Sequence, residues 1–383
     1  MLTTLTAPAF AGTWYIEDGD ITISAGESGN NVTQNKETTV NDHDTIITNR
    51  EEGASSHTVT IDAKDEDDKV EVTLKDVNID ASSRSEAAVS VTGKGDTTIE
   101  LDGDNELKSG AGHAGLEHNK TDTSGELTIQ DKDKNGSLEA AGGFKGAGIG
   151  SAGSNDAQVK ITGGNITATT SDDWGAGIGS GSYGTGTVEI TGGEINATGG
   201  YLGAGIGGGT SGNGKVTITG DAVIEESIGG SSGAGAGNAT GGAGIGGGAN
   251  GHGTIDISGN AQVKNALGKD GGAGIGSGYE GDGNVNISGN ATIENAEGGK
   301  FAAGIGGGYR GDGNVTISGN AKIDNVSGGK QAAGIGGGSF GDGTIIIKDN
   351  AMIGTAAGGN YGAGIGGGAL GVGDVTIEGN VTI

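Results

Sequence analysis

Nine aromatic residues gather around a four-residue motif, Ala-Gly-Ile-Gly, that occurs eight times between residues 147 and 366. Five lie just before a copy of the motif: Phe144, Trp174, Tyr201, Phe301 and Tyr361. Four lie just after a copy: Tyr183, Tyr279, Tyr309 and Phe340. Rings with a polar group at one end suit an extended polymer such as a polysaccharide, which binds by stacking and hydrogen bonds. The pattern predicts a glycan-binding face along the chain.

The motif itself supplies the floor of this predicted face. Alternation along a β-strand places Ala303 and Ile305 inside and turns Gly304 and Gly306 toward solvent. Over eight coils, at about 4.8 Å per coil, these glycines would form a flat strip roughly 35 Å long, open to close approach by a ligand. Four lysines lie beside the first group of rings: Lys145, Lys269, Lys300 and Lys330. The alternative is that the rings only cover strand ends and stack on one another.

A second set of residues could bind calcium. Asp131, Asp133, Asn135 and Gly136 match the start of a loop in which alternating oxygens wrap a hard cation around a glycine turn. Gly142 stands where such loops carry a bidentate glutamate, and Glu139 is the nearest substitute. The spacing predicts a structural calcium site formed by Asp131, Asp133, Asn135 and Glu139. The alternative is a solvated acidic turn.

Catalysis has less support in the sequence. The five histidines show no ligand or triad spacing: His43, His57, His113, His118 and His252. A polysaccharide lyase or hydrolase needs clustered carboxylates, or a basic residue beside a metal. No predicted coil concentrates both types, so this enzyme class stays an alternative. Ice binding is a weaker one, because the column of Thr162, Thr191 and Thr219 runs beside charged residues. Arg310-Gly311-Asp312 matches the integrin-binding tripeptide, but the repeat already supplies its glycine and aspartate, so chance is the better explanation.

The composition narrows the fold class. The chain has 383 residues, with 90 glycines, one proline, no cysteine and a net charge of −28. Collagen needs glycine at every third position with abundant proline and is excluded. High charge is also typical of disordered chains, but strand-like segments such as Val-Thr-Ile-Thr recur in register. The negative charge disfavours nucleic acid as a partner.

The motif recurs with a period typical of a solenoid. Successive motif isoleucines are 29, 28, 39, 30, 30, 30 and 30 residues apart. The unit from Ala303 to Gly329 contains three short strands separated by glycine or asparagine turns, with Val315 and Ile317 inward in the second and Ile323 and Val326 in the third. The repeat predicts an all-β, single-stranded parallel β-helix, right-handed, with about 30 residues per coil. We expect Asn260, Asn290, Asn320, Asn350 and Asn380 to form an inward ladder bonded to backbone.

The chain divides into three predicted regions. Residues 1–11 read as the remnant of a secretory signal, because Ala9-Phe10-Ala11 fits a cleavage pattern. Residues 12–140 are irregular N-terminal coils and a cap, in which Ala88-Val89 and Ala114-Gly115-Leu116 continue the period. Residues 141–383 are regular repeats, expected to continue beyond Ile383, and the 39-residue step holds a flexible loop near Gly229–Thr240. No transmembrane span is predicted, and the setting is extracellular.

The repeats resemble a domain of large secreted surface proteins from gut clostridia and their relatives, described as carbohydrate-binding or adhesin-like. The resemblance rests on Gly-Ala-Gly-Ile-Gly-Gly-Gly from Gly146 onward, on Asp76-Val-Asn-Ile-Asp80-Ala, and on the segment from Asp102 to Leu116. It implies a bacterial, cell-surface, non-catalytic role and defines no binding residues. We therefore expect a secreted adhesin or glycan-binding module that binds a polysaccharide or host glycan. A purely structural stalk is the remaining alternative.

Overall fold

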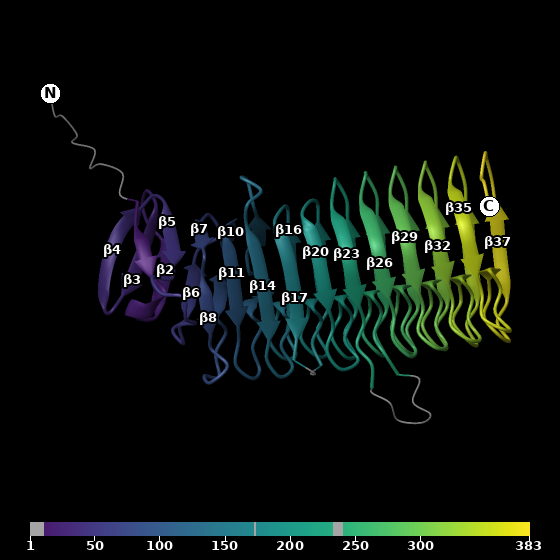
Figure 1. The fold of residues 1–383 in the computed structure, drawn as a ribbon, viewed down its shortest axis with the longest axis horizontal. Helices are drawn as coiled ribbons and strands as arrows, with labels where there is room; N and C mark the ends of the chain where they lie inside the picture. The colour runs from purple at the N-terminus through teal and green to yellow at the C-terminus, as the bar shows by residue number, and fades with distance from the viewer. Residues whose placement is uncertain (1–10, 172–173, 233–239) are drawn as a thin grey trace.

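The computed structural model describes residues 11–171, 174–232 and 240–383, which form one rod of stacked coils (Figure 1). These residues contain 37 β-strands, one turn of 3₁₀-helix, η1 (Ile16–Asp18), and no α-helix. No helix among them is long and apolar enough to cross a membrane. The chain is an all-β parallel β-solenoid with about 30 residues per turn, as the repeat predicts. Its handedness stays a prediction, and the predicted signal remnant lies outside the described residues apart from Ala11.

The strands form three sheets that run along the rod, here named sheets A, B and C. Sheet A contains the motif strands and their upstream equivalents: β2 (Ile21–Ala25), β3 (Asn30–Gln34), β4 (Glu37–Asp42), β6 (Val59–Ala63), β9 (Val89–Gly93), β12 (Leu116–Lys120), β15 (Ile149–Gly150), β18 (Ile178–Gly179), β21 (Ile206–Gly207), β24 (Ile245–Gly246), β27 (Ile275–Gly276), β30 (Ile305–Gly306), β33 (Ile335–Gly336) and β36 (Ile365–Gly366).

Sheet B contains the second strand of each coil: β1 (Thr13–Tyr15), β5 (Thr45–Thr48), β7 (Lys69–Lys75), β10 (Asp96–Asp102), β13 (Leu127–Gln130), β16 (Asp156–Ile161), β19 (Gly186–Ile190), β22 (Gly214–Ile218), β25 (Gly253–Ile257), β28 (Gly283–Ile287), β31 (Gly313–Ile317), β34 (Gly343–Ile347) and β37 (Gly373–Ile377). Sheet C contains the third: β8 (Asn78–Asp80), β11 (Asp104–Lys108), β14 (Ser137–Gly142), β17 (Asn165–Thr170), β20 (Glu194–Thr198), β23 (Val223–Ile228), β26 (Gln262–Leu267), β29 (Thr292–Glu297), β32 (Lys322–Ser327) and β35 (Met352–Ala357).

The core consists of aliphatic columns that run from coil to coil. In sheet B, Val315 pairs in register with Ile345 and Ile317 with Ile347, and all four side chains are buried. Thr316, between them, points outward, as the alternation predicts. In sheet C, Ile323 and Val326 are buried. β-branched side chains pack well on a pleated surface, and here similar aliphatic side chains stack on one another from coil to coil.

The upstream coils follow the same register despite their wider spacing. Leu116 pairs with both Val89 and Ile149, which confirms the predicted continuation of the period upstream. Near the N-terminal end, β2, β3 and β4 pair in antiparallel order, unlike the parallel coils that follow. These antiparallel strands occupy the part of the chain where a cap is predicted (Figure 1).

The predicted asparagine ladder exists, but its orientation is wrong. Asn260, Asn290, Asn320, Asn350 and Asn380 are exposed in the turn between sheets B and C. Each amide donates to the side-chain oxygen of its neighbour one coil away, as from Asn320 to Asn290 at 3.1 Å. Gly289 and Gly319 adopt φ of 68° and 69° just before Asn290 and Asn320, a conformation that favours glycine, and the next inward residues are Ala291 and Ala321. The small alanine side chains occupy the inward position at this corner, so the asparagine amides stay on the surface.

Candidate functional site

The aromatic residues are held in the two turns that flank each motif strand. In the turn that comes after the motif strand, one residue has positive φ in successive coils, for example Tyr183 at 69°, Arg310 at 64° and Phe340 at 68°. Such values are uncommon for residues other than glycine and mark positions that the surrounding structure holds in place. Here the next coil holds these residues in place. The backbone amide of Tyr183 donates to the Thr210 carbonyl at 2.7 Å, and the backbone amide of Phe340 donates to the Ala369 carbonyl at 3.0 Å.

The first group of rings centres on Trp174. Its ring centroid lies 6.2 Å from that of Phe144, 6.3 Å from that of Tyr183 and 6.5 Å from that of Tyr201. The Lys145 ammonium lies 5.2 Å from the ring centroids of both Phe144 and Trp174. The structure thus brings four predicted rings and one lysine together.

The second group centres on Tyr309. Its ring centroid lies 5.5 Å from that of Tyr279, 5.4 Å from that of Phe301 and 5.8 Å from that of Phe340. Burial and the neighbouring Glu280 carboxylate raise the pKa of the Tyr279 hydroxyl above its ordinary value. Eight of the nine predicted rings therefore fall into two groups, and we call their common edge of the rod the aromatic edge.

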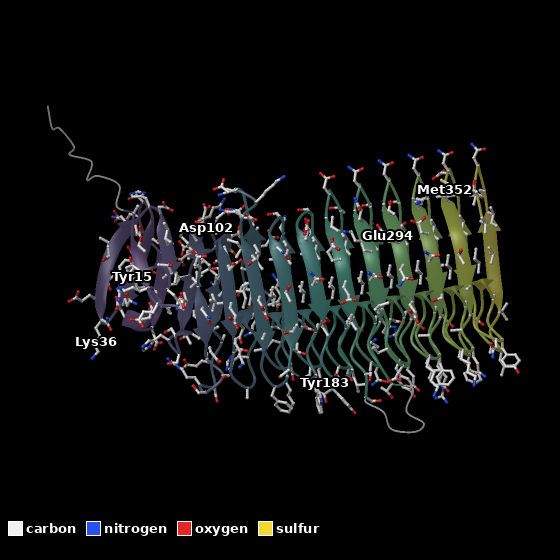
Figure 2. The ribbon with its side chains drawn as sticks, viewed as in Figure 1. Tyr15, Lys36, Asp102, Tyr183, Glu294 and Met352 are labelled. Atoms are coloured by element: carbon white, nitrogen blue, oxygen red, sulfur yellow. The ribbon has the colours of Figure 1, made fainter. Side chains whose placement is uncertain are left out.

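Large parts of these rings face solvent. Phe144, Tyr183, Tyr201, Phe340 and Tyr361 are between 37% and 73% exposed, with Tyr361 the most exposed. Figure 2 shows Tyr183 pointing away from the rod, on the side opposite the turns of the asparagine ladder. Exposed rings in contact with one another form a continuous apolar patch in contact with water. Such patches are typical of binding surfaces.

Two cations accompany the second group. The Lys300 ammonium lies 5.2 Å from the Phe301 ring centroid, and the Arg310 guanidinium lies 5.2 Å from that of Tyr309. Arg310 also donates to Glu280 at 3.0 Å. Lys330 is exposed one coil beyond Lys300, and its backbone amide donates to the Lys300 carbonyl at 2.7 Å. Arg310 was missed as a binding residue, although its place directly after Tyr309 marks it.

The predicted glycine floor is wrong. Gly304 and Gly306 are buried, as are Ala303 and Ile305 on either side. A Cβ on Gly304 would collide with Val326 of β32 and would lie 2.8 Å from the Ser327 carbonyl oxygen. The segment before β30 thus packs against sheet C, so both of its faces are covered. The glycines allow two backbones to meet inside the rod, and the rings line its edge without a floor between them.

The two ring groups are separated by the predicted insertion near Gly229–Thr240. Ser231 and Gly241 form an isolated antiparallel bridge, and the insertion begins and ends there. Residues 233–239, the centre of the predicted loop, lie outside the described residues. The Tyr279 amide donates to the Gly241 carbonyl at 3.0 Å, which places Gly241, just after the predicted loop, beside the second group.

The predicted calcium ligands do not converge in the structure. The Asp131 carboxylate accepts from the backbone amides of Asn135 at 3.2 Å and Gly136 at 3.0 Å. Asn135 donates to Asp102 at 3.2 Å, while Asp133 and Glu139 are exposed. Across the described residues, no group of three or more His, Cys, Asp or Glu is placed to hold a metal ion. The donor set present here does not fit a calcium cage, and calcium binding stays a prediction.

Sheet B carries a shallow hollow on its outer face. The polar residues that line it include Lys215, Thr217, Asp256, Asn286 and Thr316, with the apolar Ile346 at one end. Thr217, Asp256, Asn286 and Thr316 belong to the outward column that runs beside the Thr162, Thr191 and Thr219 column, and Asp256 is the only carboxylate that lines the hollow. Neither a carboxylate pair nor a row of threonines lines it.

Three segments of the chain match the family model described as Beta helix repeat, at residues 159–182, 188–210 and 285–309. They begin at Val159, Val188 and Val285, which are equivalent inward residues of sheet B, and each runs through sheet C into the next motif. Comparisons with curated proteins and with solved structures found no match. The chain therefore contains a β-helix repeat domain.

Proposed function

We propose that this chain is an extracellular, non-catalytic β-solenoid that acts as an adhesin or glycan-binding module. An extended polysaccharide or host glycan lies along the aromatic edge, stacked on the rings rather than on a glycine floor. The observation that carries the proposal is the contact of eight rings in two groups, with several of them largely exposed.

The chemistry of the edge suits a sugar polymer. A pyranose ring has an apolar face that stacks on an aromatic ring and a rim of hydroxyls that binds polar groups. The phenol groups of Tyr183, Tyr201 and Tyr279 supply donors and acceptors beside the rings. Repetition along the rod makes the binding multivalent, so weak contacts at successive sugars add up to useful avidity. The net charge of −28 argues against nucleic acid.

The test is retention of soluble polysaccharides in affinity electrophoresis, followed by calorimetry with the best one. We expect Tyr183→Ala and Phe340→Ala, one in each ring group, each to weaken binding about two- to tenfold, the range for a ring contact of about 0.5–1.5 kcal/mol. Met352→Ala is the matched control, because it removes an exposed apolar side chain from sheet C. Equal binding by all three variants would refute a role for the rings.

A polysaccharide lyase or hydrolase is the second candidate, supported only by the breadth of chemistry that parallel β-helices can carry. It predicts new reducing ends or unsaturated sugars when the same preparation is incubated with the bound polymer. Binding without either product supports the module. No binding and no product would favour a structural stalk that positions another domain.

A further inference from the structure

The lysines of the aromatic edge differ from the six lysines that form ion pairs elsewhere in the described residues. Six of the fourteen lysines outside the edge pair with carboxylates, such as Lys75 with Asp102 at 2.6 Å and Lys264 with Glu225 at 2.5 Å, so what distinguishes the edge is the clustering of unpaired lysines beside rings. In the described part of the chain, no carboxylate lies within ion-pair distance of the four edge lysines, Lys145, Lys269, Lys300 and Lys330. These ammonium groups are therefore available to a ligand.

Both ring groups carry such a lysine. Lys145 lies over Phe144 and Trp174 in the first group, and Lys300 lies over Phe301 in the second. Lys300 and Lys330 occupy equivalent places in successive coils, about 4.8 Å apart along the rod. Between residues 240 and 383 the sequence has seven lysines and arginines, and four of them lie on this edge: Lys269, Lys300, Arg310 and Lys330.

We infer that the aromatic edge selects acidic sugar polymers, whose carboxylate or sulfate groups pair with the edge lysines while their rings stack on the aromatics. This inference rests on the proposed function and names its ligand class. A lysine is a compact, strongly hydrated charge on a flexible stem, which suits anionic groups whose position varies along a polymer. A neutral polymer would leave these lysines solvated and gain nothing from them.

Carboxylates near the edge oppose an acidic ligand, among them that of Asp270, whose backbone carbonyl accepts the Phe301 amide at 3.2 Å. Glu280 is paired with Arg310, while Asp282 and Asp312 lie just beyond the turn. Their carboxylates each accept the backbone amide of the next coil, as from Asp312 to Asp282 at 2.9 Å. Their charge reduces the attraction of the edge for an acidic ligand. Asp312→Asn keeps an oxygen to accept the Asp342 amide, removes one charge, and is expected to strengthen acidic-polymer binding.

The experiment compares the full chain against a polyuronate, a chondroitin sulfate, its unsulfated counterpart and a neutral glucan, at low and high salt. We expect the two anionic classes to be retained more strongly than the glucan, with the difference lost at high salt as the charges are screened. The unsulfated and sulfated pair distinguishes carboxylate from sulfate as the recognised group. Lys300→Gln and Lys330→Gln should each weaken acidic-polymer binding roughly two- to fivefold, the range for an exposed ion pair.

Lys348→Gln is the matched control, since it makes the same charge change in the turn beside the asparagine ladder. Equal retention of the neutral glucan, or unchanged binding by the Lys300 and Lys330 variants, would overturn the acidic preference and leave the proposed function standing. Equal retention of single-stranded DNA would also overturn it, because charge alone would then decide. Failure to retain any sugar polymer would refute both proposals.

Discussion

Gly306 lies directly against the carbonyl oxygen of Gly336, its equivalent one coil along the rod. A Cβ on Gly306 would overlap that oxygen and would lie 3.3 Å from the Cα of Gly313. Its φ of 129° is also unfavourable for any residue with a side chain. The motif glycine is therefore required by the stacking of coils, and this requirement repeats along sheet A.

We expect Gly306→Ala to destabilise the rod by about 1–3 kcal/mol, the usual cost of overpacking, with added backbone strain. Gly53→Ala is the control, because nothing lies within 4 Å of a Cβ placed there. Thermal unfolding of both variants measures the difference. Equal midpoints would show that neighbouring coils can separate at Gly306 at little cost.

The glycines also show where sequence reasoning succeeds and fails. The alternation of Val315, Thr316 and Ile317 correctly predicts which side chains are buried, because sheet B has solvent on one face only. The same rule fails at Gly304, whose second face is covered by Val326 and Ser327 of sheet C. Alternation specifies opposite faces of a strand but does not reveal whether a second layer covers the outer one.

The sequence predicts which residues make up the candidate site better than it predicts which of their rings contact one another. The nine aromatics are visible in the sequence because each lies four or five residues from a motif isoleucine. The insertion predicts a gap between the rings, but the contacts that centre on Trp174 and Tyr309 depend on turn geometry and ring orientation, which residue spacing does not encode. The outward turn of Asn320 likewise depends on the positive φ of Gly319.

Tyr309 contacts three other rings, so its removal should affect both stability and binding. We expect Tyr309→Ala to lower the free energy of unfolding by about 1–3 kcal/mol, from lost ring contacts worth about 0.5–1.5 kcal/mol each, partly compensated by solvent. Tyr361→Ala is the comparison, since its ring is 73% exposed. Denaturant unfolding should separate the two variants, and equal midpoints would mean that the second ring group contributes no packing energy.

The asparagine ladder should contribute modestly to coil stacking. Asn320 donates to Asn290 and accepts from Asn350, both at 3.1 Å. We expect Asn320→Ala to cost about 1 kcal/mol, because exposed hydrogen bonds are exchanged with water on unfolding. Asn320→Asp should cost more at neutral pH than at acid pH, since a charged carboxylate cannot donate to Asn290. Urea midpoints at the two pH values measure this, and a pH-independent cost would contradict the ladder's donor role.

A buried histidine in β12 makes the rod sensitive to acid. His118 is 2% exposed, and its Nδ1 lies 3.0 Å from the Gln158 carbonyl oxygen. Burial lowers the pKa of His118 below its ordinary value of 6.5, so the folded state holds a neutral imidazole. The unfolded state binds a proton near pH 6.5 that the folded state resists. The stabilisation is therefore present above that pH and lost as the pH falls below it.

We expect the free energy of unfolding to fall as the pH drops below about 6.5, by up to about 1.4 kcal/mol per pH unit for this one proton. His118→Gln should flatten that part of the profile, even if it lowers stability at every pH. His43→Gln is the matched control, because His43 is exposed. Parallel pH profiles for the His118 variant and the unchanged chain would assign the acid sensitivity to the carboxylates, since only a group whose pKa differs between the two states can change the slope.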